Sequence, residues 1–287
     1  MPRRDNEYKG GFVDAHVHIR DWAALEAVRA AGITAVRDAG MRHNAEQGLP
    51  LHRLLVNGPL VVSSGWALYK RGGYGAYFGV PAGTREEILS EILKLKDAGA
   101  DIIKVVASGM VSLKNLGTIT PGGFSQDELS FIVEEAQRSG LVVMAHANGE
   151  QAIMDVARAN VRSVEHGFFM TTRALEVMAE RGTFWVPTMR ALARAADAGP
   201  ASDEVKTYIT GLIGSHREMI RHAHDIGVSL AVGTDCVLPD ADYRAAYDAE
   251  LRSFEQAGLS RDAVMTIACE GGARLLGLDN FTAKDAE

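Results

Sequence analysis

The chain has 287 residues, of which 47% are hydrophobic and 23% are charged, a composition typical of a soluble globular protein with a large core. Its formal net charge of −7 and the lack of any long basic run argue against nucleic-acid and membrane partners. The two cysteines exclude a disulfide framework. Because the sequence has neither an apolar leader nor a run of about 18 apolar residues, we expect a cytoplasmic protein without a transmembrane helix.

One unit recurs along the chain: an amphipathic stretch, a glycine and a short β-branched run. The glycines suit the left-handed position that ends a helix, and the runs after them have the composition of buried strands. They are Gly32, Gly99, Gly140, Gly182 and Gly227. Two capping boxes, Thr84–Glu87 and Ser125–Glu128, mark helix starts, and the apolar spacing after the first predicts a helix over 84–98.

Eight strands are predicted from such runs and from weaker candidates. They are 12–18, 33–38, 59–63, 101–106, 141–146, 162–166, 183–187 and 228–234. Helical patterns lie between most of them, and two more follow at 242–257 and 260–277. Strict alternation of strands and helices implies a parallel sheet with right-handed crossovers. Eight repeats, without a Gly-x-Gly-x-x-Gly fingerprint, favour a (β/α)8 TIM barrel over an open doubly wound sheet.

The barrel is expected to form one domain over 1–287, with a core over about 11–278, because no linker or change of composition divides the chain. Its longest strand-to-helix segments are expected at 64–83, 107–124 and 187–202. Such segments lie on the face of a barrel where active sites are built.

Metal-binding side chains occur at the carboxyl ends of several predicted strands. His16 and His18 end the first strand, His146 the fifth and His166 the sixth, and Asp235 follows the eighth. Side chains alternate along a strand, so His16 and His18 point to the same side. Imidazole nitrogens and a carboxylate suit zinc or a similar transition metal. Each residue alone has a structural interpretation, such as a capping aspartate, but their joint occurrence at equivalent positions of one repeat predicts a metal site.

Lys104 lies within the most apolar part of the fourth predicted strand. It either joins the site from inside the barrel or snorkels from the outer face. His222 and His224 occupy a helical pattern in which residues two apart diverge, so we interpret them as surface residues. The remaining histidines have no strand-end position and are interpreted as structural or solvated: His43, His52 and His216.

These residues resemble the amidohydrolase superfamily of metal-dependent hydrolases, and most of all its imidazolonepropionase-like and Xaa-Pro dipeptidase-like branch. The resemblance runs from Phe12 to Leu278. The motifs that carry it are FVDAHVH, GITAVRDAG, DIIKVVASG, AHANG, SVEHG, VPT, VGTD and GGARLLGL. Members of this branch usually carry a small β-sandwich built from both chain ends. We expect it to be absent here, because only ten residues precede Gly11 and the chain ends at LGLDNFTAKDAE.

The resemblance implies a cofactor of two divalent metal ions, most simply two Zn²⁺, bridged by a carbamate that CO₂ forms on Lys104. The other implied ligands fall into two sets. His16, His18 and Asp235 would hold one ion, and His146 and His166 would hold the other.

The chemistry expected of this site is hydrolysis. Metal coordination lowers the pKa of water to about 7, so hydroxide forms at neutral pH. Asp235 can accept the proton of that water and pass it to a leaving nitrogen. We therefore expect a metal-dependent hydrolase that cleaves an amide, lactam or related carbonyl C–N bond. A metal-dependent decarboxylase or deaminase on the same barrel is the alternative, and a non-catalytic metal-binding protein is a further one.

Substrate recognition is expected from the long loops. Five residues that follow the third predicted strand either hold a carboxylate or cover the pocket, with a solvated loop as the alternative: Tyr69, Lys70, Arg71, Tyr74 and Tyr77. Arg190, just after Val-Pro-Thr, either meets an anionic group of the substrate or forms an ordinary salt bridge. We expect a small-molecule substrate, with a carboxylate as its favoured anionic group, and a homo-oligomer is left open.

Three other reactive or charged positions have simpler interpretations. Arg37 and Asp38 are expected to pair with each other at the end of the second strand. Cys236 follows Asp235, but no independent base is assigned to it, so we place it in the pocket wall rather than as a nucleophile. Cys269 is interpreted as helix core.

Overall fold

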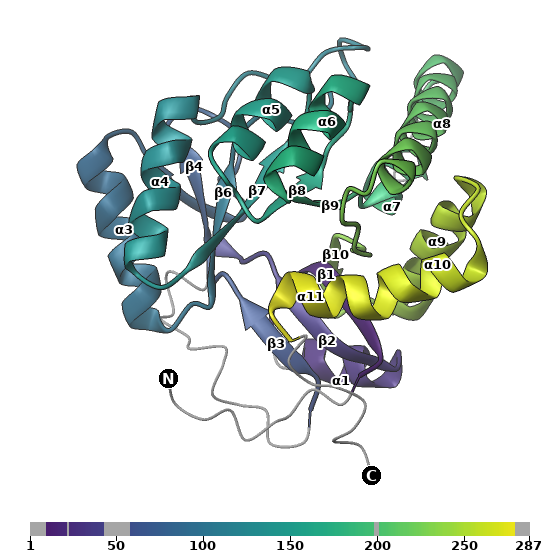
Figure 1. Cartoon of the computed structure of the whole chain (residues 1–287), viewed down its shortest axis with the longest axis horizontal. Coiled ribbons are helices and arrows are strands. Elements are labelled where there is room, and N and C mark those ends of the chain that lie inside the picture. The colour runs from purple at the N-terminus through teal and green to yellow at the C-terminus, as the bar shows by residue number, and fades with distance from the viewer. Residues whose placement is uncertain (1–9, 22, 43–57, 198–200, 279–287) are drawn as a thin grey trace.

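The computed structural model describes residues 10–21, 23–42, 58–197 and 201–278. Its strands form two sheets, in the order β10-β1-β2-β3 and β5-β4-β6-β7-β8-β9, and every ladder is parallel. The strands are β1 (Phe12–Ile19), β2 (Ile33–Asp38), β3 (Leu60–Ser63), β4 (Ala67–Lys70), β5 (Gly79–Ala82), β6 (Ile102–Val106), β7 (Val142–Ala147), β8 (Ser163–His166), β9 (Phe184–Val186) and β10 (Cys236–Leu238). Figure 1 shows how they follow one another around the molecule.

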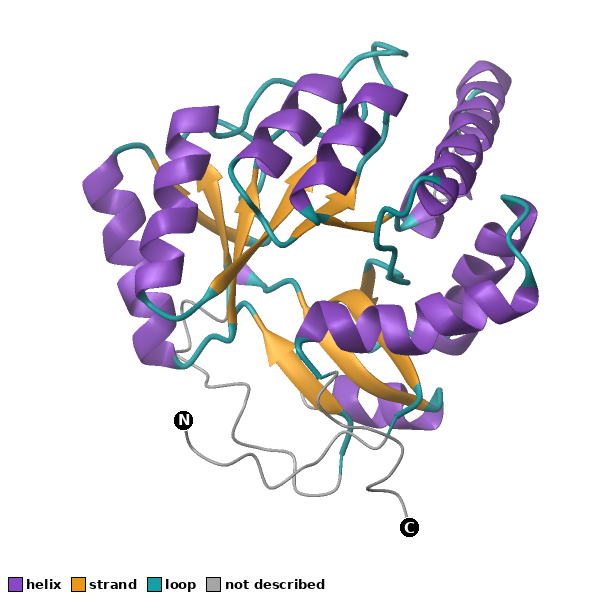
Figure 2. Ribbon diagram, in the orientation of Figure 1, coloured by secondary structure: helices purple, strands orange, loops and turns teal. Residues whose placement is uncertain are grey.

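Helices alternate with these strands and cover their outer side (Figure 2). They are α1 (Ala23–Ala30), α3 (Arg85–Ala98), α4 (Gln126–Arg138), α5 (Glu150–Arg158), α6 (Thr172–Arg181), α7 (Met189–Asp197), α8 (Asp203–Asp225), α9 (Tyr243–Gln256), α10 (Arg261–Thr266) and α11 (Gly272–Leu276). Both predicted capping boxes are present, at the starts of α3 and α4. The five predicted glycine stops all have left-handed φ angles, from 65° to 84°.

The two sheets close into a barrel at two seams. At one seam the Asp101 amide donates to the Ser63 carbonyl oxygen (2.8 Å). At the other, the segment 229–232 lies between β9 and β1. Trp185 exchanges backbone hydrogen bonds with Ser229 and Ala231, and the Ala15 amide donates to the carbonyl oxygen of Val232 (2.8 Å). The predicted (β/α)8 TIM barrel is thereby confirmed.

The last predicted strand, 228–234, is not a regular strand in the structure. Residues 228–234 occupy a strand position but form only an isolated bridge, Trp185 to Leu230, and the regular strand is β10, just beyond. The cause is that Thr234 bonds to the Asp14 carboxylate instead of a neighbouring backbone. Asp235 then takes a left-handed φ of 54°, which interrupts the ladder.

The long segment predicted at 64–83 contains two strands rather than a loop alone. After a bend at Ser64–Trp66 the chain leaves β2 and pairs with β6, placing Ala67 opposite Lys104. β5 then pairs with the outer edge of β4. The segment 187–202 likewise contains α7, whereas 107–124 stays irregular apart from a bridge between Val111 and Ile119.

The final predicted helix, 260–277, is broken by a π-helical turn at Ile267–Gly271 between α10 and α11. Here the chain packs tightly on the barrel. A Cβ atom on Gly272 would lie 2.4 Å from the Cβ of Val13, and one on Gly271 would lie 2.4 Å from the carbonyl oxygen of Leu230. The Gly-Gly pair therefore allows the helix to rest directly on β1. Within the described ranges, no helix is long and apolar enough to span a membrane.

Candidate metal centre

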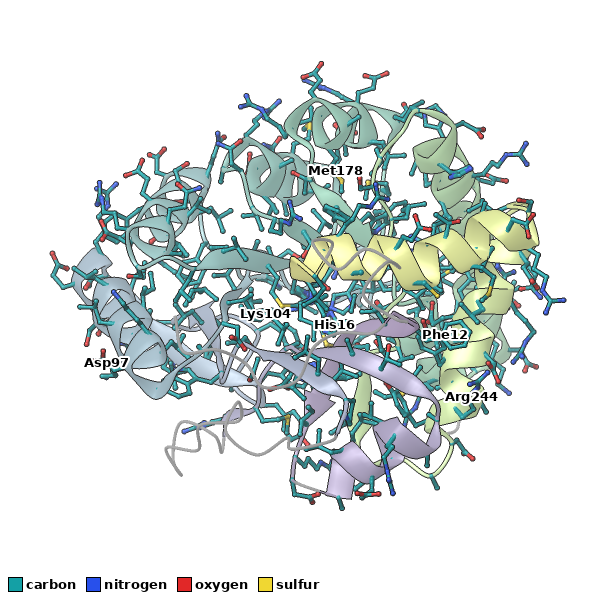
Figure 3. The ribbon with its side chains drawn as sticks, turned by 60° about the horizontal axis from the view of Figure 1, so that its bottom comes forward. Phe12, His16, Asp97, Lys104, Met178 and Arg244 are labelled. Carbon is teal, nitrogen blue, oxygen red and sulfur yellow. The ribbon has the colours of Figure 1, made fainter. Side chains whose placement is uncertain are left out.

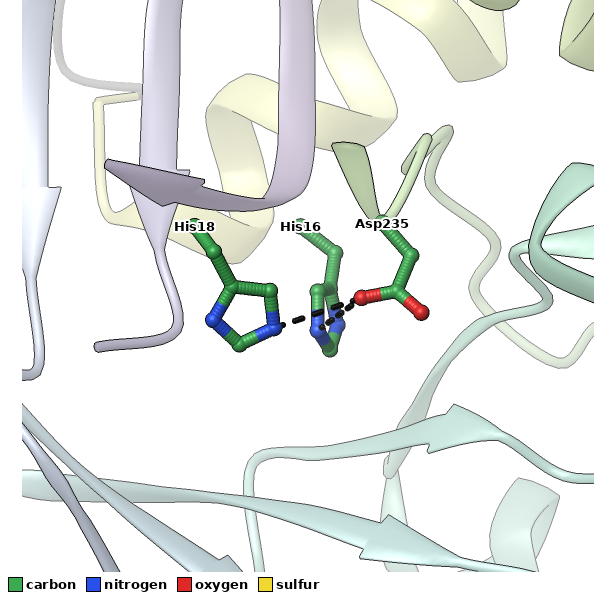
Figure 4. A group of neighbouring side chains, drawn as sticks. All are labelled: His16, His18 and Asp235. Atoms are coloured by element: carbon green, nitrogen blue, oxygen red, sulfur yellow. Dashed lines mark ion pairs between the residues drawn. The ribbon is translucent and has the colours of Figure 1, made fainter. Parts of the chain in front are cut away.

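Two histidines of β1 and the aspartate before β10 form a compact cluster (Figure 4). The Asp235 amide donates to the His16 carbonyl oxygen (2.8 Å), which places the aspartate beside the strand. Its Oδ1 lies 3.3 Å from Nε2 of His16 and 3.3 Å from Nε2 of His18. The ligand atoms of the three residues all lie within 4.8 Å of one another.

These distances fit a zinc ion. Two ligands that bind zinc tetrahedrally at about 2.1 Å lie about 3.4 Å apart, close to the two separations of Asp235 Oδ1 from the histidine nitrogens. Each histidine also uses its other ring nitrogen elsewhere: Nδ1 of His18 donates to the carbonyl oxygen of Gly40 (2.7 Å), and Nδ1 of His16 donates to Glu165 (2.6 Å). The cluster thus presents two imidazole nitrogens and one carboxylate oxygen to a common point.

His146 and His166 form a second pair beside this cluster. Their ring centroids are 4.6 Å apart, and His166 lies 5.1 Å from the ring of His16. Nε2 of His146 donates to the carbonyl oxygen of Gly109 (3.0 Å), whereas Nδ1 of His166 bonds to the Thr188 hydroxyl (2.6 Å). Burial lowers the pKa of His146 to about 4 and that of His166 well below its ordinary value. Both rings are therefore neutral at pH 7, the form that binds metals.

Lys104 points into the barrel, as the side chains around it show. Ile103 and Val105 belong to the core between strands and helices, whereas Ile102 packs inside with Val62 and other residues. Alternation puts Lys104 on the side of Ile102, and Figure 3 shows it with His16 near the centre of the molecule.

The surroundings of Lys104 disfavour the charged form of its amine. The side chain is 4% exposed, and its Nζ has no hydrogen-bond partner in the described part of the chain. Burial lowers the pKa of Lys104 to about 8, with the charges of Glu165 and Asp235 acting in the opposite direction. A substantial fraction of the amine is therefore neutral near physiological pH.

A second layer of buried polar residues, which the sequence did not reveal, supports the cluster. Glu165 and Asp14 are both fully buried. Asp14 accepts hydrogen bonds from the amides of His16 and Thr234 (3.1 Å each) and from the hydroxyl of Tyr243 (3.0 Å). Burial raises the pKa of Asp14 to about 6. The only sequence signal for these two residues was their position. Asp14 lies two residues before the predicted ligand His16, and Glu165 lies one residue before His166.

The expected pairing of Arg37 with Asp38 is wrong. Arg37 instead forms an ion pair with Glu165 (2.8 Å). Asp38 accepts hydrogen bonds from the amides of Ile19 and Gly40 and from Ser63. Adjacent strand residues point to opposite faces, so the two side chains cannot meet.

Three predicted substrate-binding tyrosines have different environments. Tyr69 is buried in β4. The ring of Tyr74 lies 5.3 Å from that of His146, and burial together with the charge of Asp235 raises the pKa of its hydroxyl to about 12. Tyr77 is 55% exposed and packs edge-on against Phe78. Phe78, which sequence reasoning missed, stacks on His18 with a centroid distance of 4.1 Å.

Arg190 is the second residue of α7. Glu250 of α9 accepts hydrogen bonds from the backbone amides of Met189 and Arg190 and so caps this helix. Burial raises the pKa of Glu250 to about 8. No ion pair is formed by the Arg190 guanidinium within the described ranges, and its Nε is buried there without a partner. The alternative of an ordinary salt bridge finds no support in these residues.

The two cysteines and the other described histidines have environments that suit structural roles. Cys236 is buried, and this burial raises the pKa of its thiol to about 12, which argues against a nucleophile. Cys269 is half-buried in the π-helical turn. His216 is buried against the Pro187 carbonyl, and the structural interpretation fits it. On α8, His222 is half-buried and His224 is exposed. His43 and His52 lie outside the described residues.

A (β/α)8 barrel that gathers four histidines and an aspartate at the carboxyl ends of its strands has the architecture expected of a metal-dependent hydrolase. The chain belongs to the amidohydrolase family, whose profile matches residues 10–281. It is 30% identical to the ochratoxinase of Aspergillus niger over 242 residues, which cover 75% of this chain and 49% of the relative. The chain thus spans about half the length of that relative.

Solved structures agree with this assignment. A crystal structure described as an amidohydrolase is 28% identical, with a TM-score of 0.76 over 94% of this chain and 75% of the other. A prolidase complexed with N-methylphosphonate-L-proline is 26% identical, with a TM-score of 0.76 over 94% and 74% of the two chains. The predicted family is confirmed, while the roles of the individual ligands stay predictions.

Proposed function

We propose that the protein is a metal-dependent hydrolase that cleaves an amide, lactam or related carbonyl C–N bond of a small molecule. The observation that carries this proposal is the position of Asp235 Oδ1, 3.3 Å from Nε2 of both His16 and His18. Membership of the amidohydrolase family supports it.

In this proposal the site holds two Zn²⁺ ions. His16, His18 and Asp235 would hold one, and His146 and His166 would hold the other. When bound, the ions supply a water acidic enough to attack at neutral pH and polarise the scissile carbonyl.

Lys104 is proposed to bridge the two ions as a carbamate. Its neutral amine forms an N–C bond to CO₂ and releases one proton, leaving an anionic carboxylate. The depressed pKa of Lys104 favours the reactive neutral amine, and the unpartnered Nζ leaves the amine without a competing hydrogen bond.

Asp235 has a second proposed role as the proton carrier. The Asp235 carboxylate lies beside Nε2 of His16 and His18, and an aspartate that is ionised at neutral pH can accept a proton. Only 21% of its side chain is exposed. Asp235 takes a proton from the attacking water and gives it to the leaving nitrogen.

Tyr74, Tyr77 and Arg190 are proposed to recognise the substrate, and the buried Tyr69 to form part of the pocket wall. The raised pKa of Tyr74 keeps its hydroxyl protonated as a donor, and the buried Nε of Arg190 has no hydrogen-bond partner within the described residues. Both properties suit a substrate carboxylate. The named relatives supply a first panel: ochratoxin, from the ochratoxinase, and Xaa-Pro dipeptides, from the prolidase.

The test is metal analysis of the purified chain followed by a screen of this panel together with N-acyl amino acids and lactams. We expect zinc in the protein and release of a new amine from at least one substrate. The double variant His16→Ala/His18→Ala should lose both zinc and turnover. Release of CO₂ without an amine, or of ammonia alone, would replace this proposal by a decarboxylase or a deaminase. Full activity of the double variant would contradict it.

A further inference from the structure

Glu165 lies at the centre of a buried hydrogen-bond network that contacts the candidate metal-binding cluster. It belongs to β8, directly before His166, and it is fully buried. Its carboxylate contacts side chains from two other parts of the barrel, His16 of β1 and Arg37 of β2. A buried carboxylate in such a position commonly fixes the orientation of a metal-ligating histidine.

The two oxygens of Glu165 have separate partners. Oε1 accepts hydrogen bonds from Arg37 (2.8 Å) and from the Ser163 hydroxyl. Oε2 accepts a hydrogen bond from Nδ1 of His16 (2.6 Å). Arg37 is itself held by the carbonyl oxygen of Ala15 (2.7 Å), so the carboxylate cannot turn without breaking several buried contacts.

The consequence concerns which nitrogen of His16 carries a proton. An ionised carboxylate only accepts hydrogen bonds, so the ring nitrogen facing it must be Nδ1–H. Nε2, which faces Asp235 at 3.3 Å, is then the nitrogen with a lone pair for a metal. We infer that Glu165 is a positioning residue that selects the metal-binding tautomer of His16, with Arg37 fixing the orientation of its carboxylate. This inference rests on the proposed role of His16 as a metal ligand.

The variant Glu165→Gln tests this directly, because an amide has only one accepting oxygen. The Arg37 guanidinium is a donor only and will draw that oxygen to the Oε1 position. The NH₂ group then faces Nδ1 of His16 and requires a lone pair there. His16 is forced into the Nε2–H tautomer, and the hydrogen blocks its metal-binding nitrogen.

The experiment measures zinc affinity by competition with a chelator, using the full chain after metal removal. We expect Glu165→Gln to weaken zinc binding about 10–100-fold. Glu250→Gln is the matched control, since Glu250 is equally buried but contacts the amides of Met189 and Arg190. Its zinc affinity should equal that of the wild type. In Arg37→Met/Glu165→Gln the amide is free to turn its oxygen toward His16, so part of the lost affinity should return.

A second measurement needs no variant. Nitrogen-15 NMR of the zinc-loaded wild type should show His16 with Nδ1–H and a metal-bound Nε2. Binding through Nδ1 would overturn the inference, as would equal zinc affinities of Glu165→Gln and Glu250→Gln or a double variant no better than Glu165→Gln. A wild-type chain that takes up no zinc would contradict the proposed function itself, and the inference with it.

Discussion

The carboxylate of Asp14 accepts hydrogen bonds from both the amide (3.1 Å) and the hydroxyl (2.7 Å) of Thr234. This contact joins residues 220 positions apart in the chain and places the next residue, Asp235, beside His16. The Thr234 hydroxyl also accepts a hydrogen bond from the Cys236 amide (3.2 Å). The left-handed backbone of Asp235, with a φ of 54°, is therefore held from both sides.

Thr234→Val is expected to lower the free energy of unfolding by about 1–3 kcal/mol, because it leaves a buried carboxylate with one partner fewer. Urea unfolding of the metal-free protein measures this. Thr183→Val is the matched control, since Thr183 is equally buried and its hydroxyl has no partner in the described part of the chain. An equal loss in the two variants would show that the contact with Asp14 contributes nothing specific.

Glu250 predicts a pH dependence of stability. Burial raises the pKa of Glu250 from 4.5 to about 8, so between these values the folded chain holds a proton that the unfolded chain releases. The unfolding free energy of the wild type therefore falls as pH rises through this window. Glutamine does not titrate, so the stability of Glu250→Gln relative to the wild type should increase from pH 5 to pH 8, by an amount on the order of a few kcal/mol. A difference that is constant across this range would contradict the raised pKa.

Asp235→Asn separates the two proposed roles of this residue. The amide keeps an oxygen that can bind zinc but cannot accept the proton of the attacking water. Hydrolysis should fall by about 10²–10⁴-fold while much of the zinc stays bound. If the variant lost its zinc and regained its rate in excess zinc, Asp235 would be a ligand only.

Lys104→Ala tests the carbamate bridge. The variant should bind one zinc ion fewer and lose most activity, because the bridging carboxylate is missing. A short carboxylic acid such as acetate should restore part of both by taking the place of the carbamate. Zinc per chain, measured by elemental analysis, and the hydrolysis rate provide the readouts. A variant that keeps two zinc ions without added acid would show that Lys104 does not bridge them.

The barrel and the strand-end positions of the candidate ligands were predictable because their signals are local. Glycine stops, capping boxes and histidines at strand ends each depend on a few neighbouring residues. The ion pair of Arg37 with Glu165 joins residues 128 positions apart and exists only once the barrel has closed. The same holds for the stacking of Phe78 on His18.

Tertiary contacts also explain the errors in strand assignment. The apolar run at 228–234 has the composition of a regular strand, but the bond between Thr234 and Asp14 diverts it. Tyr69 lies in a segment rich in glycine and tyrosine, and it becomes a strand residue because β6 offers a free edge after the bend at Ser64–Trp66. Local composition identifies neither Asp14 as the partner of Thr234 nor β6 as the partner of the strand that contains Tyr69.

The central claim is that hydrolysis depends on a two-zinc site, and a zinc titration tests it most directly. The wild-type chain, freed of metal and kept in bicarbonate, is titrated with zinc while the release of amine from a substrate identified in the screen is followed. We predict no turnover without zinc and a rate that reaches its plateau at two zinc ions per chain. Full turnover by the metal-free chain would contradict the account, and a plateau at one ion would contradict the bridged pair.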